Sequence, residues 1–169
     1  MLRFLSLNLV GWAFLILATP AAHAGLLFDA TLDGAQEVPA NASLATGYST
    51  VLLNDLEDQI TVNFSWSGLS AAATAAHIHG PALPGFNASP VFTFTGIGGV
   101  GISGSMPEQV FAITPAQVAA LKEGLYYVNV HNSIYPGGEI RGQLALIPEP
   151  TMLSLLALGG LTLLRHKRR

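Results

Sequence analysis

A regular alternation of apolar and polar side chains over 59–69 is the strongest constraint on the fold of this chain. Four apolar residues share one parity of that segment: Ile60, Val62, Phe64 and Trp66. A period of two is typical of a β-strand with one buried face. Similar short segments, bounded by Gly, Pro, Asn and Asp, predict further strands over 26–33, 47–54, 74–79, 91–95, 100–106, 125–131 and 139–146.

One helix interrupts this series of strands. Thr114 is the predicted N-cap, Pro115 suits the first helical position, and Gln117 completes a capping box. Gly124 is the natural stop. Many short strands with one short helix favour an all-β fold, either a Greek-key β-sandwich or a barrel. The predicted domain spans 25–146, which is long enough for one hydrophobic core.

The N-terminal residues 1–24 read as a signal peptide. Arg3 precedes an apolar run over 4–17, and Ala22 and Ala24 form an A-x-A cleavage site. The run is shorter than the roughly 20 apolar residues of a membrane span, so a cleaved signal is favoured over a retained anchor. We therefore expect the chain to pass through the secretion translocon.

The C-terminal residues 148–169 have three parts. Pro148, Glu149 and Pro150 precede an apolar run over 151–164, which is predicted as a transmembrane-like helix. Basic residues close the chain: Arg165, Lys167, Arg168 and Arg169. Basic residues beside an apolar helix stay on the cytoplasmic side of a membrane. The run therefore suits a transient stop-transfer signal, and a simple tail anchor is the alternative.

The order of these three parts resembles the PEP-CTERM sorting signal of exopolysaccharide-producing bacteria. That resemblance implies that an exosortase recognises Pro148, Glu149 and Pro150 and cleaves the chain near them. It also implies a transient stay in the inner membrane and then release to the cell surface or extracellular matrix. Removal of the tail and its retention as an anchor both remain open.

The segment between the two termini is acidic and has no cysteine. Of the seven Lys and Arg residues only Lys122 and Arg141 lie there, whereas all ten Asp and Glu residues except Glu149 do. A domain without a basic stripe is a poor partner for nucleic acid. The lack of cysteine excludes disulfides, zinc fingers and cysteine nucleophiles. Stability must come from the core or from a bound metal.

Three histidines fall inside the predicted domain: His77, His79 and His131. Alternate residues of a strand share a face, so His77 and His79 point the same way. If the aliphatic faces form the core, all three histidines lie on outward faces. The same parity places three further polar residues on such faces as a supporting set: Asn129, Glu139 and Arg141.

This arrangement of histidines is adequate for a metal ion. Imidazole ligands suit Cu and Zn, and an H-x-H pair with a third histidine supplies three of them. The alternative is that the histidines are polar residues that hold the loops over 80–90 and 132–138 by hydrogen bonds. Spacing alone leaves both interpretations open.

Four segments then carry a second resemblance, in the order ATLDGAQEVP over 30–39, AAHIHGP over 75–81, LYYVNVH over 125–131 and PGGEIRGQL over 136–144. Together they resemble the CHRD domain, a module first recognised as a repeat in chordin and also found in bacterial exported proteins. The resemblance implies a β-sandwich module over nearly the whole predicted domain.

The histidine pattern is also similar to that of copper/zinc superoxide dismutase. This similarity implies a superoxide dismutase-like architecture in which His77, His79 and His131 stand where copper ligands stand, with Arg141 nearby. The sequence lacks that enzyme's bridging histidine, zinc-loop ligands and disulfide, so dismutation itself is not expected.

Two functions of different classes follow from these observations. The favoured one is a non-enzymatic adhesion or structural module at the cell surface or in the matrix, with exopolysaccharide or other surface proteins as partners. The alternative is a Cu- or Zn-binding domain that uses His77, His79 and His131, with a redox-related role. An extracellular hydrolase has the least support, because it needs paired carboxylates at a defined separation.

Overall fold

A computed structural model describes residues 25–148 of the chain. The predicted signal peptide with Ala22 and Ala24, and the sorting segment after Pro148, lie outside these residues. The elements in order are β1 Leu26–Asp33, the 3-10 helix η1 Gly34–Gln36, β2 Thr46–Leu53, β3 Gln59–Ser67, β4 Ala73–His79, β5 Pro90–Thr93, β6 Gly104–Ala112, α1 Pro115–Lys122, β7 Tyr127–Asn132, β8 Ile140–Gln143 and β9 Ala145–Leu146.

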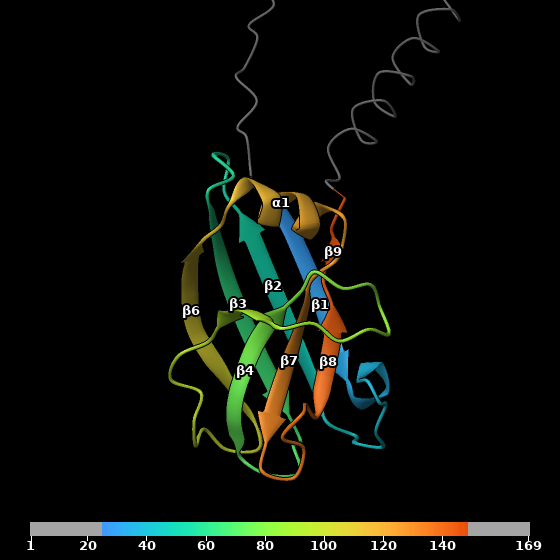
Figure 1. The fold of residues 1–169 in the computed structure, drawn as a ribbon. Helices are drawn as coiled ribbons and strands as arrows, with labels where there is room; N and C mark the ends of the chain where they lie inside the picture. The colour runs from blue at the N-terminus through green and yellow to red at the C-terminus, as the bar shows by residue number, and fades with distance from the viewer. Residues whose placement is uncertain (1–24, 149–169) are drawn as a thin grey trace, which may run out of the picture.

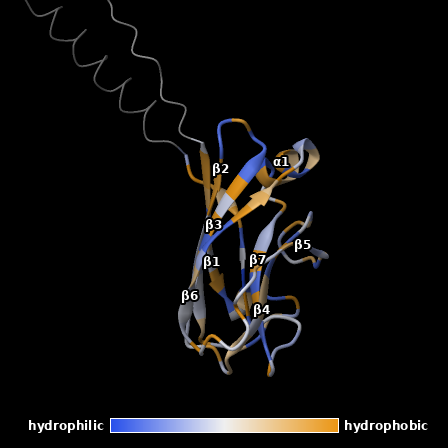
Figure 2. Cartoon of the chain, turned by 90° about the vertical axis from the view of Figure 1, so that its left-hand side faces the viewer, coloured by the Kyte–Doolittle hydropathy of each residue, from blue (hydrophilic) through white to orange (hydrophobic). Residues whose placement is uncertain are grey.

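The strands form one antiparallel sheet in the order β5-β4-β7-β8-β1-β2-β3-β6, with β9 paired to β1. The sheet rolls up so that β4, β7 and β8 lie in front of β1, β2 and β3 (Figure 1). Figure 2 shows the two layers edge-on. Because β6 returns beside β3 and β7 returns beside β4, the connections cross between the layers in the Greek-key manner. The predicted all-β fold is confirmed.

Side chains, and not backbone hydrogen bonds, bring the two edge strands β5 and β6 together. The ring of Phe111 on β6 lies 5.2 Å from that of Phe92 on β5 and 6.0 Å from that of Phe94. The backbone N–H of Thr95 donates to Oε1 of Gln109 at 3.0 Å. The barrel is therefore nearly closed, and its seam is held by aromatic contacts.

The hydrophobic core lies on the face of the sheet that the alternating pattern predicts to be buried. All four apolar residues of β3 are at least 96% buried, and Phe64 and Trp66 stack with ring centroids 5.3 Å apart. The helix α1 covers one end of the barrel (Figure 1) and buries Val118 and Leu121. Its capping box, from Thr114 to Gln117, is present as predicted.

The predicted strand over 100–106 is misplaced, because β6 runs over 104–112. Pro107 and Glu108 interrupt the alternating pattern from which this strand would have been predicted. They form a bulge, since Met106 pairs with Phe64 and Gln109 pairs with Val62. A proline has no N–H to donate and is tolerated at a bulge on an edge strand, which is where β6 lies. The last predicted strand, over 139–146, divides into β8 and β9. Among the described residues, no helix has the length and hydropathy to span a membrane.

Candidate metal centre

The pairing of β4 with β7 brings the three histidines together. In the register of this pair, Ala75 lies opposite His131 and His77 lies opposite Asn129, so the histidines occupy adjacent positions on one face. The potential ligand nitrogens all lie within 4.8 Å of one another. The ring centroids of His77 and His131 are 4.9 Å apart, and those of His77 and His79 are 5.3 Å apart. The geometry therefore presents three imidazoles to one point.

Backbone carbonyls orient two of the three rings. The Nδ1 atom of His79 lies 2.9 Å from the carbonyl oxygen of Ala88, and the Nδ1 atom of His131 lies 3.0 Å from that of Pro136. A carbonyl oxygen only accepts, so each Nδ1 carries the proton and each Nε2 keeps its lone pair. These bonds are the loop contacts of the alternative interpretation, and they also serve as the outer hydrogen bonds that metal-binding histidines make.

The electrostatics of the cluster keep its histidines neutral. Burial lowers the pKa of His77 to about 4, with further lowering from the charges of His131 and His79. Burial also lowers the pKa values of His79 and His131, against opposing hydrogen bonds from each ring to its carbonyl. A metal ion binds only the neutral imidazole, so the cluster is ready for a metal near neutral pH.

The donor set fits Cu or Zn. Three imidazole nitrogens are a common ligand set for either ion. Nε2 of His79 is buried and has no hydrogen-bond partner, and the His79 ring lies 5.3 Å from that of His77 and 6.0 Å from that of His131. A metal at this point would satisfy that atom.

The face that carries the histidines is not open to solvent as expected. Asn129 and Arg141 lie there as predicted, and Tyr127 lies there with them, yet all three are buried. The cause is a second covering layer, made by the loops over 34–41 and 80–89. Arg141 donates to Oδ1 of Asn87 at 3.2 Å and to the carbonyl of Phe86 at 2.9 Å, which holds the second loop against the sheet.

A stack of three side chains lies beneath that loop. The ring of Tyr127 lies parallel to that of His79, with centroids 5.0 Å apart. The guanidinium carbon of Arg141 lies 3.4 Å from the centroid of the Tyr127 ring, which is a cation–π contact. Tyr127 was not predicted as a residue of this face, although it has the same strand parity as His131.

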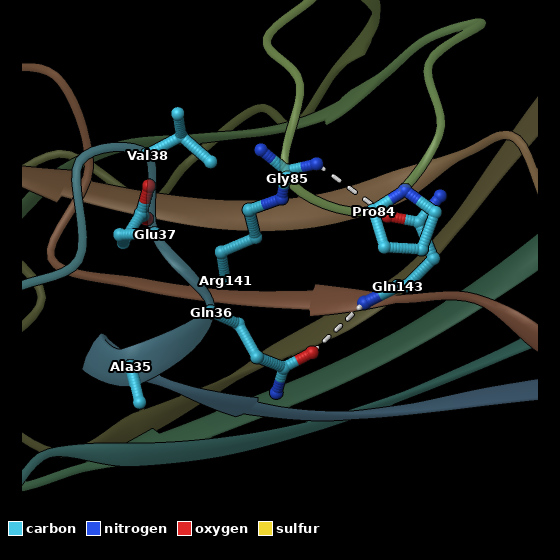
Figure 3. Close-up of a pocket in the computed structure, with 8 residues that line it drawn as sticks. All are labelled: Ala35, Gln36, Glu37, Val38, Pro84, Gly85, Arg141 and Gln143. Atoms are coloured by element: carbon cyan, nitrogen blue, oxygen red, sulfur yellow. Dashed lines mark hydrogen bonds between the residues drawn. The ribbon is translucent and has the colours of Figure 1, made fainter.

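Glu37 is a further buried residue that the sequence did not single out. It lines a pocket of about 180 Å³ together with Arg141, and Figure 3 shows the Arg141 side chain crossing between Glu37 and Gly85. Burial raises the pKa of Glu37 to about 7, against the lowering effect of the Arg141 charge. The two groups form no direct ion pair.

Glu139 does not join the histidine group, which corrects its placement on the supporting face. Its carboxylate accepts hydrogen bonds from Ser43, Ser70 and Asn132. Asn132 has the opposite strand parity to His131, so the Glu139 carboxylate that it contacts lies away from the histidine face. Burial is the largest influence on the pKa of Glu139 and raises it, but these hydrogen bonds together lower it. Its position indicates a structural role.

Comparison with known proteins confirms the predicted resemblance to the CHRD domain. A sequence profile described as the CHRD domain matches residues 28–144. No curated protein matches the chain, and no solved structure matches it.

Proposed function

The chain belongs to the CHRD domain family, and we propose that it is an exported β-module that binds one Cu or Zn ion through His77, His79 and His131. The observation that carries the proposal is the approach of three imidazole nitrogens to within 4.8 Å of one another. Surface histidines that merely hold loops need no such convergence. In this protein the same imidazole rings both hydrogen-bond to loop carbonyls and converge on one another.

The ligand atoms follow from the hydrogen bonds. His79 and His131 use Nδ1 for carbonyls, so both would offer Nε2 to the metal. His77 would offer Nδ1, which lies 3.0 Å from Nε2 of His131. Without metal, a proton on Nδ1 of His77 bridges these two atoms. To hold a metal through Nδ1, His77 would carry its proton on Nε2 instead, and the ion would accept the three lone pairs.

The proposed place of action is the cell surface or extracellular matrix. This part of the proposal rests on the sequence of the two termini, with an exosortase as the processing partner. The acidic domain then serves as a non-enzymatic adhesion or structural module, with exopolysaccharide or other surface proteins as its partners. A redox role of the metal is the runner-up. Changing Pro148 and Pro150 to Ala should leave the chain in the membrane fraction if sorting works in this way.

Metal content tests the proposal. The full-length chain is loaded with Cu or Zn, dialysed, and its metal measured. We expect close to one equivalent in the wild type and loss of it in the triple His77→Ala, His79→Ala, His131→Ala variant. The matched control is His166→Ala in the tail, which should keep the metal. Equal uptake by the triple variant and the wild type would refute the site.

The adhesion role has its own test. Binding to exopolysaccharide or to surface proteins should survive the triple histidine substitution, because that role does not require the metal. If all such binding disappears in a triple variant that still folds, then adhesion is not an independent function of this module.

A further inference from the structure

Three buried side-chain atoms in the described part of the chain have no hydrogen-bond partner: Oε1 of Glu37, Nε2 of His79 and Oδ1 of Asn129. The residues that carry them are 6%, 7% and 3% exposed. Buried polar groups in folded proteins almost always have partners, and an exception indicates a water or ion at that place. Three exceptions in one neighbourhood therefore point to an occupied site.

Asn129 connects the other two residues. It lies directly opposite His77 in the pairing of β7 with β4. A Cβ at Gly138 would lie 2.4 Å from Oε1 of Glu37 and 2.5 Å from Nδ2 of Asn129, so these two atoms flank the same point. The three residues thus share one buried space beside the histidines.

The chemistry of the three atoms differs in a useful way. Nε2 of His79 has a lone pair and needs a Lewis acid, which the metal supplies. Above the Glu37 pKa of about 7, Oε1 of Glu37 and Oδ1 of Asn129 are both acceptors, so they cannot satisfy each other. They need donors. A water molecule has a lone pair for a metal and two O–H groups for two acceptors.

We propose that Asn129 and Glu37 hold an exchangeable water on the metal, so that the centre is an open one that can take a small exogenous ligand. This inference rests on the proposed metal site. A metal with three protein ligands and one water is the arrangement of open sites, whereas closed structural sites use four protein ligands. The pocket lined by Glu37 and Arg141 lies directly beside the Glu37 side chain (Figure 3).

The experiment measures water on the metal directly. The full-length chain is loaded with Cu(II), its stoichiometry is checked, and the longitudinal relaxation rate of bulk water protons is recorded with and without azide. Coordinated, exchanging water speeds this relaxation. In the wild type we expect an enhancement that azide abolishes as it replaces the water.

Two variants test the roles of Glu37 and Asn129. In Glu37→Gln the new amide can donate to Oδ1 of Asn129 and so takes the place of the water. In Asn129→Leu an acceptor is lost. Both should keep the copper, lose the relaxation enhancement and bind azide more tightly than the wild type, because azide no longer has to displace a held water. Asn63→Leu, on the exposed face of β3, is the matched control and should resemble the wild type.

The outcomes separate the two proposals. If no copper binds, the metal site is wrong, and this inference fails with it. If copper binds but relaxation shows no azide-sensitive enhancement, the site is closed and only this inference fails. If the enhancement is present but unchanged in a correctly folded Glu37→Gln variant, then Glu37 does not hold the water.

Discussion

Nδ1 of His77 lies 3.0 Å from Nε2 of His131, although the two residues are 54 positions apart in the chain. The contact exists because β4 and β7 are neighbours in the sheet, and it aligns two ring nitrogens that a metal can bridge.

A substitution at Gly138 should show how closely the covering loop over 34–41 approaches the sheet. Gly138 has a φ of 130°, and a Cβ there would lie 2.4 Å from Oε1 of Glu37. We expect Gly138→Ala to lower the free energy of unfolding by about 1–3 kcal/mol, through backbone strain and displaced polar groups. The measurement is urea unfolding.

The neighbouring glycine is the control for that experiment. Gly137 has no atom within 4 Å of an added Cβ. Gly137→Ala should therefore change the free energy of unfolding by no more than about 0.5 kcal/mol. Equal losses in the two variants would show that the close approach at Gly138 has no energetic consequence.

Arg141 should act as the clamp of the loop over 80–89. Arg141→Met keeps much of the volume but removes the bonds to Asn87 and Phe86 and the contact with Tyr127. We expect a loss of about 2–4 kcal/mol in unfolding free energy. Metal affinity should fall by about tenfold, because the same loop carries the carbonyl of Ala88 that orients His79.

A surface cation serves as the comparison for Arg141. Lys122 forms an exposed ion pair with Glu57, and Lys122→Met should cost about 0–1 kcal/mol. If Arg141→Met were as mild as this, the cation–π stack and its hydrogen bonds would not be holding the loop.

Glu139 should matter for stability and not for metal. Its buried carboxylate accepts from Ser43, Ser70 and Asn132. Glu139→Ala leaves those donors without a partner, and we expect a loss of about 3–5 kcal/mol in unfolding free energy. Where the variant still folds, its copper stoichiometry should equal that of the wild type. The exposed Glu108→Ala is the control, and a copper-free but folded Glu139→Ala protein would place Glu139 in the metal site after all.

The stability of the metal-free protein should depend on pH through two opposing groups. The pKa of His77 falls from 6.5 to about 4 on folding, so between these values the unfolded chain binds more protons and acid destabilises the fold. The pKa of Glu37 rises from 4.5 to about 7, so the folded chain binds more protons there and increasing pH destabilises the fold. The two slopes oppose each other between pH 4.5 and 6.5.

Removing one group should expose the other. Glu37→Gln should show stability that rises with pH from about 4 to 6.5, since the lowered pKa values of His77, His79 and His131 then act without the opposing effect of Glu37. His77→Gln should show a weaker rise of stability with pH, because Glu37 is then opposed only by His79 and His131. Thermal unfolding across this range measures both. Parallel pH profiles in the two variants would contradict the opposing assignments.

Much of the fold could be predicted from local pattern. The alternation on β3 specified its buried face, and Thr114, Pro115 and Gln117 specified the start of α1. The strand β6 escaped prediction because its bulge at Pro107 breaks the pattern of a regular strand. A proline inside a strand can be recognised only when the strand is known to lie at an edge.

The site was less predictable than the fold. Parity placed His77, His79 and His131 on one kind of face, but their meeting required the pairing of β4 with β7, which no local signal contains. The burial of Arg141 and Asn129 was also hidden, because it comes from two loops that fold back over the sheet. The same loops bring in Glu37, whose place near Asn129 depends on tertiary structure alone.

X-ray absorption at the Cu or Zn edge of the loaded full-length chain identifies the atoms bound to the metal. We expect a first shell that contains three imidazole nitrogens, at about 2.0–2.1 Å for Zn, and loss of that signal in the triple His77, His79 and His131 variant. A bound metal with fewer than three imidazoles, or a spectrum that the triple substitution leaves unchanged, would contradict the proposed site.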